Sequence, residues 1–389
     1  MKIACVTTFD IHNPAGWPRR HLGLYGASAK IAQTLEAEDI SIDYLGPLKR
    51  KRSPITRLKW QFYRSLRHKD FYSWADPIIS QSYARQIEQK LPGSDADILL
   101  CLENAIPLAA VQTTRPMVLW TDTTLGSLID FYPYLSNLCA ETRNHLLTME
   151  QGVLERCSLI VLNSQWAAQK AHDLYQVPLS KIEVIPRGAS RAHSFSSEAV
   201  KTAIENRAHR PCRLLFVGVE WYRKGGDIAL HVAQMLNAQG LETELLIVGC
   251  VPPNEVPDFA KVHGFIDRTT PAGITKMAQL FQSAHFLIYP SKADALGVAL
   301  SEAAAFGVPA LAADVGGVAG LVKANISGQT FAVDSSPADY CASVVAYMAD
   351  PDRYRTLAYS ALNYYETQVS WSAAGKRASV LLEKLASNR

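Results

Sequence analysis

The length, composition and net charge of the chain exclude several classes of protein. Its 389 residues exceed what one ordinary hydrophobic core organises and fit two domains. Apolar residues make up 48% and charged residues 19%, which excludes a disordered chain, and a net charge of +3 does not by itself indicate a nucleic-acid partner. Any functional charge must therefore be local.

The chain start and the cysteines bear on the cellular compartment. Residues 1–6 run straight into an apolar, strand-like segment, so we expect no signal peptide, and no apolar stretch is long enough to span a bilayer. The seven cysteines are scattered, odd in number and include no Cys-x-x-Cys pair. This pattern favours reduced thiols in a cytosolic protein over a disulfide framework or a zinc site.

Strands and helices alternate through the first half of the chain. Short apolar or β-branched runs predict strands at Ile3–Thr7, Ile42–Leu45, Ile98–Leu102, Val118–Thr121, Leu159–Leu162 and Ile182–Ile185. Helix-like stretches lie between several of them, at Leu24–Glu38, Pro77–Leu91, Leu138–Arg156 and Gln165–Tyr175. Strands that alternate with helices are typical of a parallel α/β sheet.

One strongly basic stretch, residues 49–69, interrupts this pattern. Its cations are Lys49, Arg50, Lys51, Arg52, Arg57, Lys59, Arg64, Arg67 and Lys69, and they are interleaved with Trp60, Phe62, Tyr63 and Leu66. A basic amphipathic helix can lie on an anionic membrane surface. The alternative is a solvated helix whose aromatic side chains pack on the first domain. Nucleic acid is disfavoured, because we find no recognised binding module.

A second α/β series follows a polar stretch, residues 189–211, which we interpret as a linker. Strands are predicted at Leu214–Val219, Leu245–Val248, Phe286–Tyr289 and Pro309–Ala312. Helices are predicted at Asp227–Ala238, Pro271–Ser283, Val298–Phe306, Ala338–Ala349, Asp352–Thr367 and Ser372–Leu385. Two open α/β sheets in one chain predict a ligand where their strand ends face each other, in the cleft between the domains.

The segment 214–227 joins a buried strand to a helix through a turn with two adjacent cations and two glycines. Gly225 and Gly226 allow close approach to the backbone, and a helix start offers free amides to an anion. Arg223 and Lys224 supply positive charge that suits a phosphate. An ordinary solvated basic turn is the alternative. A complete dinucleotide-binding or P-loop pattern is missing, which argues against an oxidoreductase or a P-loop enzyme.

The segment 288–309 has a related organisation. A strand ends at Pro290, a loop carries Asp294 and Gly297, and a helix containing Glu302 follows. Amides near Gly297 could hold an anion, and the Glu302 carboxylate could accept hydrogen bonds from a sugar diol. Alternatively, Asp294 caps the helix and Glu302 is a surface residue.

These two segments resemble the C-terminal half of the family 4 retaining glycosyltransferases of the GT-B fold. The resemblance rests on the spacing from Gly218 to Arg223-Lys224-Gly225 and on two acidic residues, Asp294 and Glu302, eight positions apart. Secondary similarities are Val248-Gly249, the loop Gly264-Phe265-Ile266, Val315-Gly316-Gly317, Ile185-Pro186-Arg187-Gly188 and Asn163-Ser164 with Trp166. The resemblance is strong from Leu214 to Phe331 and loose before Asn163.

The resemblance implies a fold and a domain layout. It implies an α/β protein with two facing Rossmann-like domains and a deep cleft between them. Residues 1–188 would bind the acceptor, residues 212–371 would bind a nucleotide sugar, and helix 372–389 would pack back on the first domain. The implied location is cytoplasmic, and basic residues 49–69 extend this to a peripheral position at the inner face of the membrane.

The resemblance also implies roles for individual residues. Arg223 and Lys224 would bind the donor diphosphate, the amides of Ala295, Leu296 and Gly297 would hold its distal phosphate, and Gly218 belongs to the same donor site. Asp294 would face the transferred sugar and Glu302 the ribose hydroxyls, while Gly264, Phe265 and Ile266 would line the base. Gly16, Trp17 and Arg19, in the loop after the first strand, would contact the acceptor.

Two positions depart from the family pattern. The first acidic residue is usually Glu, and Asp294 is one methylene shorter, which puts its contact with the sugar in doubt. Family members often carry a His-Asp-like pair after an N-domain strand, whereas this chain has Thr121-Asp122. Asp122 is retained as a catalytic candidate that orients donor or acceptor, beside the alternative of a turn residue.

The implied reaction moves a hexose-type sugar from a UDP- or GDP-sugar to a glycan, a lipid-linked or a small-molecule hydroxyl. Positive charge from Arg223, Lys224 and the helix-terminus amides would stabilise the leaving diphosphate, so we expect neither a metal nor a cofactor. Two alternatives remain: a catalytically inactive binding or scaffold protein of the same fold, motivated by the departures at Asp294 and Thr121, and a nucleotide-sugar epimerase. A phosphorylase is disfavoured for want of a cofactor lysine motif.

Overall fold

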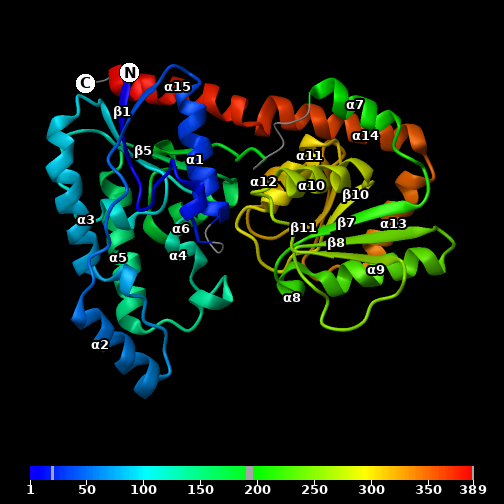
Figure 1. The fold of residues 1–389 in the computed structure, drawn as a ribbon, viewed down its shortest axis with the longest axis horizontal. Helices are drawn as coiled ribbons and strands as arrows, with labels where there is room; N and C mark the ends of the chain where they lie inside the picture. The colour runs from blue at the N-terminus through cyan, green and yellow to red at the C-terminus, as the bar shows by residue number, and fades with distance from the viewer. Residues whose placement is uncertain (19–21, 190–195, 388–389) are drawn as a thin grey trace. The chain divides into compact units, whose positions relative to one another are not determined.

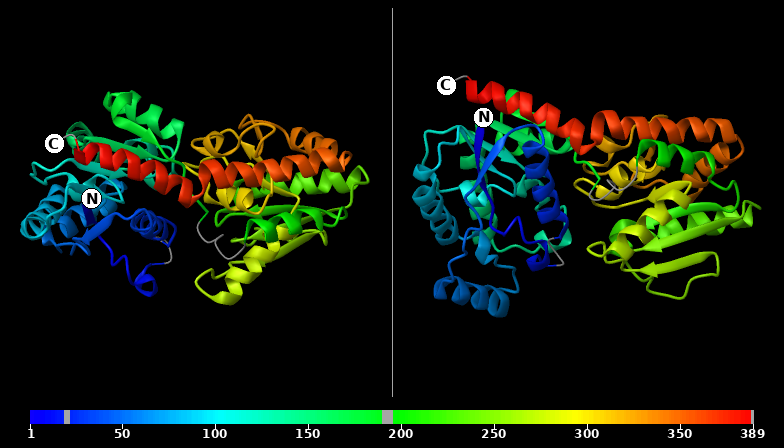
Figure 2. Two further views of the ribbon diagram at one scale, coloured as in Figure 1. Left: turned by 90° about the horizontal axis from the view of Figure 1, so that it is seen from above. Right: turned by 45° about the horizontal axis from the view of Figure 1, so that its top comes forward.

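A computed structural model describes residues 1–18, 22–189 and 196–387 of the chain (Figures 1 and 2). The chain divides into two compact units. Unit 1 comprises Met1–Pro186 with Ala374–Arg389, and unit 2 comprises Arg187–Ala373. Each unit contains one six-stranded sheet in which every strand pair is parallel. The prediction of an α/β fold with two Rossmann-like sheets is therefore confirmed.

The sheet of unit 1 has the strand order β2-β1-β3-β4-β5-β6. These strands are β1 (Lys2–Val6), β2 (Ser41–Tyr44), β3 (Ile98–Cys101), β4 (Met117–Trp120), β5 (Leu159–Leu162) and β6 (Ile182–Val184). The four residues of β3, β4 and β5 are all buried, as expected for central strands covered on both faces. The sequence predicted all six strands to within two residues at each end.

The helices of unit 1 are α1 (Leu22–Glu36), α2 (Pro54–Phe62), α3 (Pro77–Lys90), α4 (Leu125–Leu128), α5 (Ala140–Arg156) and α6 (Gln165–Tyr175). Local signals fix several of their starts. Asp76 caps α3 by accepting from the amide of Ile78, and Pro77 occupies the first helical position. In Figure 1, α1 and α3 lie on opposite sides of the strands, as right-handed crossovers on either side of β1 require.

The sheet of unit 2 has the strand order β12-β11-β10-β7-β8-β9. Its strands are β7 (Cys212–Val217), β8 (Thr243–Val248), β9 (Ala260–Gly264), β10 (Phe286–Tyr289), β11 (Ala310–Ala313) and β12 (Gly328–Phe331). Side chains of β10 alternate between two cores: Phe286 and Ile288 pack in one, Leu287 and Tyr289 in the other. The sheet is thus covered on both faces.

The helices of unit 2 are α7 (Ser197–Glu205), α8 (Trp221–Lys224), α9 (Gly226–Ala238), α10 (Pro271–Ser283), α11 (Val298–Ala305), α12 (Val318–Leu321), α13 (Pro337–Met348) and α14 (Pro351–Tyr364). Helices α9 and α13 contribute to the core that contains Phe286, and α10 and α11 to the core that contains Leu287. The two pairs appear on opposite sides of the sheet in Figure 1.

Five elements of unit 2 were not predicted, and two of them, α8 and α12, are helices of only four residues. The edge strands β9 and β12 contain Lys261, His263 and Gln329, so neither shows the apolar run that marks a buried strand. Helix α7 forms within the range interpreted as a linker, because Val200 and Ile204 pack on α14 at Ala358 and Leu362.

One helix, α15 (Trp371–Ser387), belongs to both units, since its residues from Ala374 onward lie in unit 1. There, Arg377 donates a hydrogen bond to the carbonyl of Val184 at 2.9 Å. A side chain at Gly375 would approach Thr34 of α1 to 2.5 Å, so the two helices pack closely. Across the described parts of the chain, we find no helix long and apolar enough to cross a membrane.

Candidate functional site

The turn after β7 brings the two predicted cations toward the end of β10. Helix α8 ends at Gly225, whose φ of +75° lies in the region that favours glycine. A Cβ atom there would lie 2.0 Å from the carbonyl oxygen of Pro290, and one at Gly218 would lie 2.8 Å from Cγ of Lys224. Glycine is therefore required at Gly225 and favoured at Gly218 by close packing around Lys224.

Lys224 forms a buried cluster with two residues that follow β10. Its ammonium donates to Oη of Tyr289 at 2.5 Å and to the carboxylate of Asp294. Tyr289 also donates its hydroxyl proton to Asp294. Burial lowers the pKa of Lys224 below its ordinary value, and the attraction of Asp294 offsets only part of that effect. Tyr289 was not predicted as a site residue.

Asp294 connects this cation to the start of α11. Its Oδ1 accepts hydrogen bonds from the amides of Leu296 and Gly297 at 3.3 and 3.1 Å. Burial raises the pKa of Asp294, but the Lys224 charge, the hydrogen bonds from Lys224 and Tyr289 and the amide of Leu296 outweigh it, so the pKa lies below the ordinary value. The Asp294 carboxylate thus occupies the place where the sequence predicts a bound anionic ligand.

This arrangement bears on the alternatives left open for Asp294. The cap-like contact is present, because Asp294 accepts from the loop amides at the start of α11. The contact with Lys224 is present as well, so the basic turn is not a solvated one: the side chains of Lys224 and Asp294 are 13% and 10% exposed. Ala295 lies in the same loop and is buried.

Arg223 is oriented by a neighbour that was not predicted. Its guanidinium makes two hydrogen bonds to the carboxylate of Glu220, at 2.8 and 3.0 Å, and a third to the carbonyl of Ala293 at 2.7 Å. The hydrogen bonds from Arg223 lower the pKa of Glu220. Arg223 therefore contacts the residue that precedes Asp294 in the loop.

Glu302 is buried, so its interpretation as a surface residue is wrong. Both terminal nitrogens of Arg268 donate hydrogen bonds to the Glu302 carboxylate, and the distance from Nη1 to Oε2 is 3.0 Å. Burial opposes the charge of Arg268, but the attraction of Glu302 raises its pKa above the ordinary value. Both residues line a small pocket of about 20 Å³, whose other residues are Ile274, Met277, Ala278, Phe281 and Phe306.

The loop predicted to line a base precedes Arg268. Gly264 ends β9 with a φ of +62°, and its carbonyl accepts from the amide of Gly249 at 2.8 Å. Phe265 is exposed, whereas Ile266 packs against the core. Because Arg268 follows Ile266 by two residues, the Arg268–Glu302 pair ties this loop to α11.

In unit 1, Asp122 follows β4 and accepts a hydrogen bond from the side-chain amide of Asn163, which follows β5. The next turn is held by Glu150, a buried carboxylate that was not predicted. It accepts from the amides of Leu125 and Gly126 at 2.7 and 2.9 Å and from the hydroxyl of Tyr175 at 2.5 Å. Glu150 thus fixes the backbone that follows Asp122.

The predicted acceptor residues lie in the loop after β1. Gly16 ends a short 3₁₀ helix, Pro14–Gly16. Trp17 donates its indole N–H to the carbonyl of Asp10 at 2.7 Å and contacts the rings of Phe9 and Tyr25 edge-on. Arg19 lies outside the described residues. Trp17 is therefore part of an aromatic cluster on the first unit.

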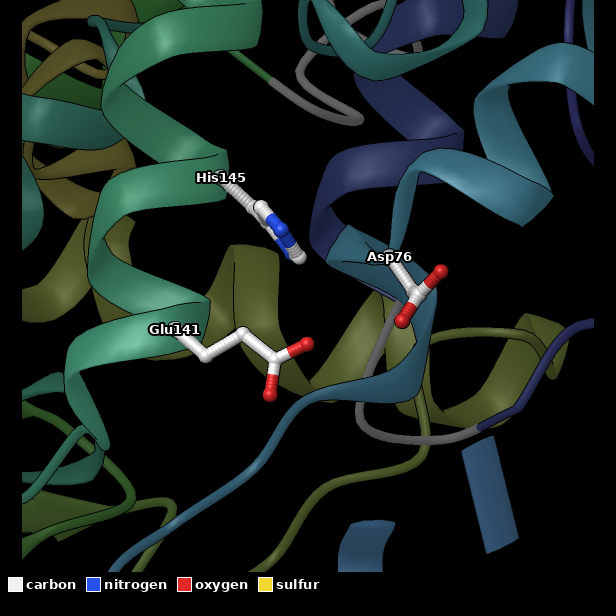
Figure 3. Close-up of side chains that lie close together, drawn as sticks. All are labelled: Asp76, Glu141 and His145. Atoms are coloured by element: carbon white, nitrogen blue, oxygen red, sulfur yellow. The ribbon is translucent and has the colours of Figure 1, made fainter. Parts of the chain in front are cut away.

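One cluster of side chains among the described residues could in principle hold a metal ion (Figure 3). Asp76, Glu141 and His145 point toward one another there. However, the ammonium of Lys59 lies 3.0 Å from Asp76 and 2.5 Å from Glu141. The chain itself thus supplies a cation, the Lys59 ammonium, to these two carboxylates.

Comparison with known proteins shows what most of the second unit is similar to. Residues 211–350 match the family described as Glycosyl transferases group 1. D-inositol 3-phosphate glycosyltransferase of Thermobispora bispora is 29% identical over 254 residues, 61% of this chain and 58% of that protein. Enzyme 1 of that name from Catenulispora acidiphila is 30% identical over 245 residues, 59% of this chain and 57% of that protein. The chain thus spans little more than half the length of these curated relatives.

Solved structures extend the similarity to the whole fold. Sucrose-phosphate synthase from Thermosynechococcus elongatus superposes with a TM-score of 0.68 at 16% identity and 100% coverage of both chains. HepE from Anabaena, in complex with UDP, has a TM-score of 0.64 at 15% identity, covering 99% of this chain and all of that one. WaaG, a glycosyltransferase involved in lipopolysaccharide biosynthesis, has 0.62 at 16% identity, covering 98% and 99%. The predicted resemblance to GT-B glycosyltransferases of group 1 is confirmed.

Proposed function

We propose that this chain is a retaining, metal-independent glycosyltransferase that moves a hexose-type sugar from a nucleotide-sugar donor to a hydroxyl acceptor. The observation that carries the proposal is the cluster of Lys224, Asp294 and the amides that start α11. A buried cation beside the backbone amides at the N-terminus of a helix forms a site for an anion. The similarity of residues 211–350 to group 1 glycosyl transferases gives that anion a chemical identity, a diphosphate.

The donor diphosphate would compete with Asp294 for the same partners. Lys224, Leu296 and Gly297 direct their protons at the Asp294 carboxylate, which carries one negative charge. A phosphate with more charge and more acceptor oxygens would replace it there and restore a full counter-charge to Lys224. The displaced carboxylate would then be available to accept from a hydroxyl of the transferred sugar.

During transfer, the bond between the sugar C1 and the distal phosphate oxygen breaks, and negative charge develops on that phosphate. Lys224 and the amides of Leu296 and Gly297 would stabilise this charge, with Arg223 nearby. These groups supply the positive charge themselves, and neither segment 214–227 nor segment 288–309 contains an Asp-x-Asp triplet. Metal independence is proposed on this basis, and retention on the family resemblance.

The donor base and the acceptor are proposed from the relatives. Structures of HepE contain UDP, UDP-glucose, or UDP with glucose, so a UDP-sugar is the donor to test first and a GDP-sugar the second. The curated relatives named D-inositol 3-phosphate glycosyltransferase suggest an inositol phosphate among small-molecule acceptors, beside glycan and lipid-linked hydroxyls. Glu302 would bind the ribose once Arg268 yields or shares the carboxylate, and Gly264–Ile266 would contact the base.

A cytoplasmic location is part of the proposal. All seven cysteines are free in the structure, and six of them are buried. This suits a reducing compartment. Gly16, Trp17 and Arg19 stay the proposed acceptor contacts, and Asp122 the proposed orienting residue of unit 1.

A thermal-shift panel tests the donor site. UDP, GDP, ADP and their common sugar conjugates are added to the wild type and to Lys224→Ala, with and without EDTA. A ligand at about 100 times its Kd stabilises the native state by about 2.7 kcal/mol. We expect one nucleoside diphosphate to raise the Tm of the wild type, with or without EDTA, and to leave Lys224→Ala unchanged.

The same panel, followed by product analysis of the nucleotide sugar that raises the Tm, separates the alternatives. A shift by a nucleotide sugar with no transfer to any hydroxyl would favour an inactive binding protein. Conversion of the donor into a second nucleotide sugar would indicate an epimerase. No shift with any nucleotide would contradict the proposed donor site.

A further inference from the structure

Helix α2 and the π-helical turn after it, Tyr63–Arg67, expose an unusual amount of apolar surface. Ile55, Leu58 and Phe62 recur at spacings of three and four, which places them on one face of the helix, and Leu66 lies about one turn further on. Leu58 is 65% exposed and Leu66 is 70% exposed. We call these four residues the apolar stripe.

A different face holds α2 on unit 1. Thr56 is buried, and Lys59 and Tyr63 are half-buried on the same side. Lys59 pairs with Asp76 and Glu141, and Tyr63 donates to Glu141 at 3.1 Å and stacks on Phe71. One interpretation of the sequence was that the aromatic side chains pack on the first domain. Tyr63 does so, but the apolar stripe does not.

The charge around the stripe has one sign. Residues 49–69 contain nine Lys or Arg and no Asp or Glu. Of these cations, Lys59 faces the unit, whereas Arg57 and Arg64 are exposed. Arg64 lies over the ring of Trp60 at 4.9 Å and Arg67 over that of Phe62 at 5.9 Å, so the cations border exposed aromatic rings.

Helix α2 also has a defined position relative to the edges of the first sheet. It is inserted between β2 and α3, in the connection that leaves the carboxyl end of β2. Figures 1 and 2 show it projecting from the body of unit 1. Because all strands of this sheet are parallel, the loop of Trp17 and the turn of Asp122 leave the same edge. The apolar stripe therefore belongs to the edge at which a ligand of this sheet is expected.

We infer that α2 with its π turn docks on the surface of an anionic lipid bilayer. Exposed Leu, Ile and Phe side chains on a helix edge, bordered by Arg and with no acidic residue, match a layer of acyl chains beneath anionic headgroups. A folded protein partner would need acidic residues to match the cations and an apolar groove to match the stripe. A bilayer meets both requirements with one surface.

Docking would bring the carboxyl edge of the first sheet to the membrane. If the proposed glycosyl transfer holds, this favours a lipid-linked hydroxyl over a freely diffusing one as the acceptor. That consequence rests on the proposed function, whereas the docking itself rests only on α2.

Co-sedimentation of the full chain with vesicles tests the docking. The protein is mixed with vesicles of phosphatidylcholine, and with vesicles of phosphatidylcholine and phosphatidylglycerol, at low and high salt. We expect binding to the phosphatidylglycerol vesicles that weakens with salt, and about tenfold or more weaker binding to neutral ones. Equal binding to both kinds of vesicle, or none to either, would overturn the inference.

Matched variants locate the contact. Leu58→Ser with Leu66→Ser removes half of the apolar stripe, and Leu174→Ser with Leu179→Ser makes the same changes at exposed positions elsewhere in unit 1. The first pair should weaken vesicle binding about tenfold, and the second should not. Arg57→Glu with Arg64→Glu is matched in charge by Arg85→Glu with Lys170→Glu, all at exposed positions. Equal loss in both members of either comparison would overturn the assignment to α2.

The nucleotide thermal shift, measured on the same variants, separates the two proposals. The stripe variant should keep the wild-type response to the nucleoside diphosphate, which also shows that it is folded. Vesicle binding without any nucleotide response would leave the docking standing and contradict the proposed function. A nucleotide response without vesicle binding would do the reverse.

Discussion

Two buried carboxylates of unit 1, Glu103 and Glu150, are held in the opposite way to those of unit 2, whereas a third, Asp76, pairs with the half-buried Lys59. In unit 1, Glu103 accepts from the amide and hydroxyl of Thr8, and Glu150 accepts from two amides and Tyr175. Every one of these donors is neutral. Burial raises the pKa of both carboxyls, and the hydrogen bonds offset only part of the effect.

In unit 2, Asp294 and Glu302 each face a cation. Lys224 and Tyr289 hold the first, and Arg268 holds the second with two hydrogen bonds. The pKa of Asp294 lies below its ordinary value, although burial alone would raise it. The charged form of a buried carboxylate is thus favoured at Asp294 and opposed at Glu103 and Glu150.

The difference indicates which carboxylates can be exchanged for a ligand. A carboxylate held by neutral backbone amides fixes a loop, and its replacement by a larger anion would add charge where no cation is present. A carboxylate beside a buried cation leaves a complete anion site when it moves away. We therefore infer that Asp294 marks an exchangeable site in unit 2, whereas Glu103 and Glu150 serve the framework of unit 1.

Removing the cation of the exchangeable site should have the largest effect. Lys224→Ala is expected to lower turnover by about 100- to 1000-fold, because one charged donor to the developing phosphate is lost. Steady-state kinetics with the UDP-sugar that the thermal shift selects would measure it. Lys292→Ala, which removes an exposed lysine from the neighbouring loop, is the matched control and should retain near wild-type turnover. Equal activity of both variants would show that Lys224 does not act on the donor.

Removing the carboxylate of the other ion pair should lower stability, in addition to weakening the ribose contact proposed for Glu302. Glu302→Leu takes from Arg268 its bidentate partner and is expected to lower the free energy of unfolding by about 3–5 kcal/mol, measured by urea denaturation. The double variant Arg268→Met with Glu302→Leu should recover most of that loss, because no buried charge is then left without its counter-ion. A double variant as unstable as the single one would contradict this account of the pair.

Neutralising the internal competitor should strengthen product binding. In Asp294→Asn, the amides and Lys224 lose their anionic partner, so the affinity for the nucleoside diphosphate is expected to rise about tenfold by titration calorimetry. Turnover should fall, since the proposed contact with the transferred sugar is lost. Asp314→Asn, at an exposed aspartate after β11, is the control and should leave the affinity unchanged. A weaker affinity in Asp294→Asn would mean that Asp294 and the phosphate do not compete.

The smallest effect concerns the dependence of stability on pH. The pKa of Glu150 is raised in the folded chain above the ordinary 4.5, so its stabilising contribution is complete below pH 4.5 and is lost as pH rises through the folded pKa. Relative to Glu150→Gln, the wild type should therefore lose stability as pH rises from 4.5. Asp294 has the opposite sign: its contribution is present above pH 3.8 and is lost as pH falls further.

Urea denaturation of the wild type, Glu150→Gln and Asp294→Asn across this pH range would compare the two carboxylates directly. If the free energy of unfolding that each residue contributes changed with pH in the same direction for both, the opposite pKa shifts of Glu150 and Asp294 would be contradicted.

The sequence predicts the strands of unit 1 more completely, but it marks the local motifs of unit 2 more specifically, for a physical reason. The turn from Gly218 to Gly225 and the loop from Asp294 to Gly297 are local motifs, and short-range geometry requires their residue types. Their partners are not local. Arg268 reaches Glu302 across 34 positions, and no spacing rule marks such a contact. A signal for Arg268 existed only in its position two residues after Ile266, in the predicted base-lining loop.

Unit 1 offered weaker signals. Glu150 lies in the middle of α5, where a glutamate is usually solvated, and only its contact with the turn after β4, 24 or 25 positions away, shows why it is buried. A basic amphipathic helix was predicted from the composition of residues 49–69, and α2 spans Pro54–Phe62 of that stretch. Which of its side chains face the unit depends on Asp76 and Glu141, and no local pattern could reveal that.

The boundary of the units within α15 has a consequence for synthesis of the chain. Unit 1 is discontinuous: it combines residues 1–186 with a segment that begins at Ala374, and all of unit 2 is encoded between them. On the ribosome, the first sheet therefore emerges long before the segment that packs beside Thr34 and bonds to Val184. Unit 2 is continuous and can complete its core first. The packing of unit 1 is therefore completed only after all of unit 2 has been synthesised.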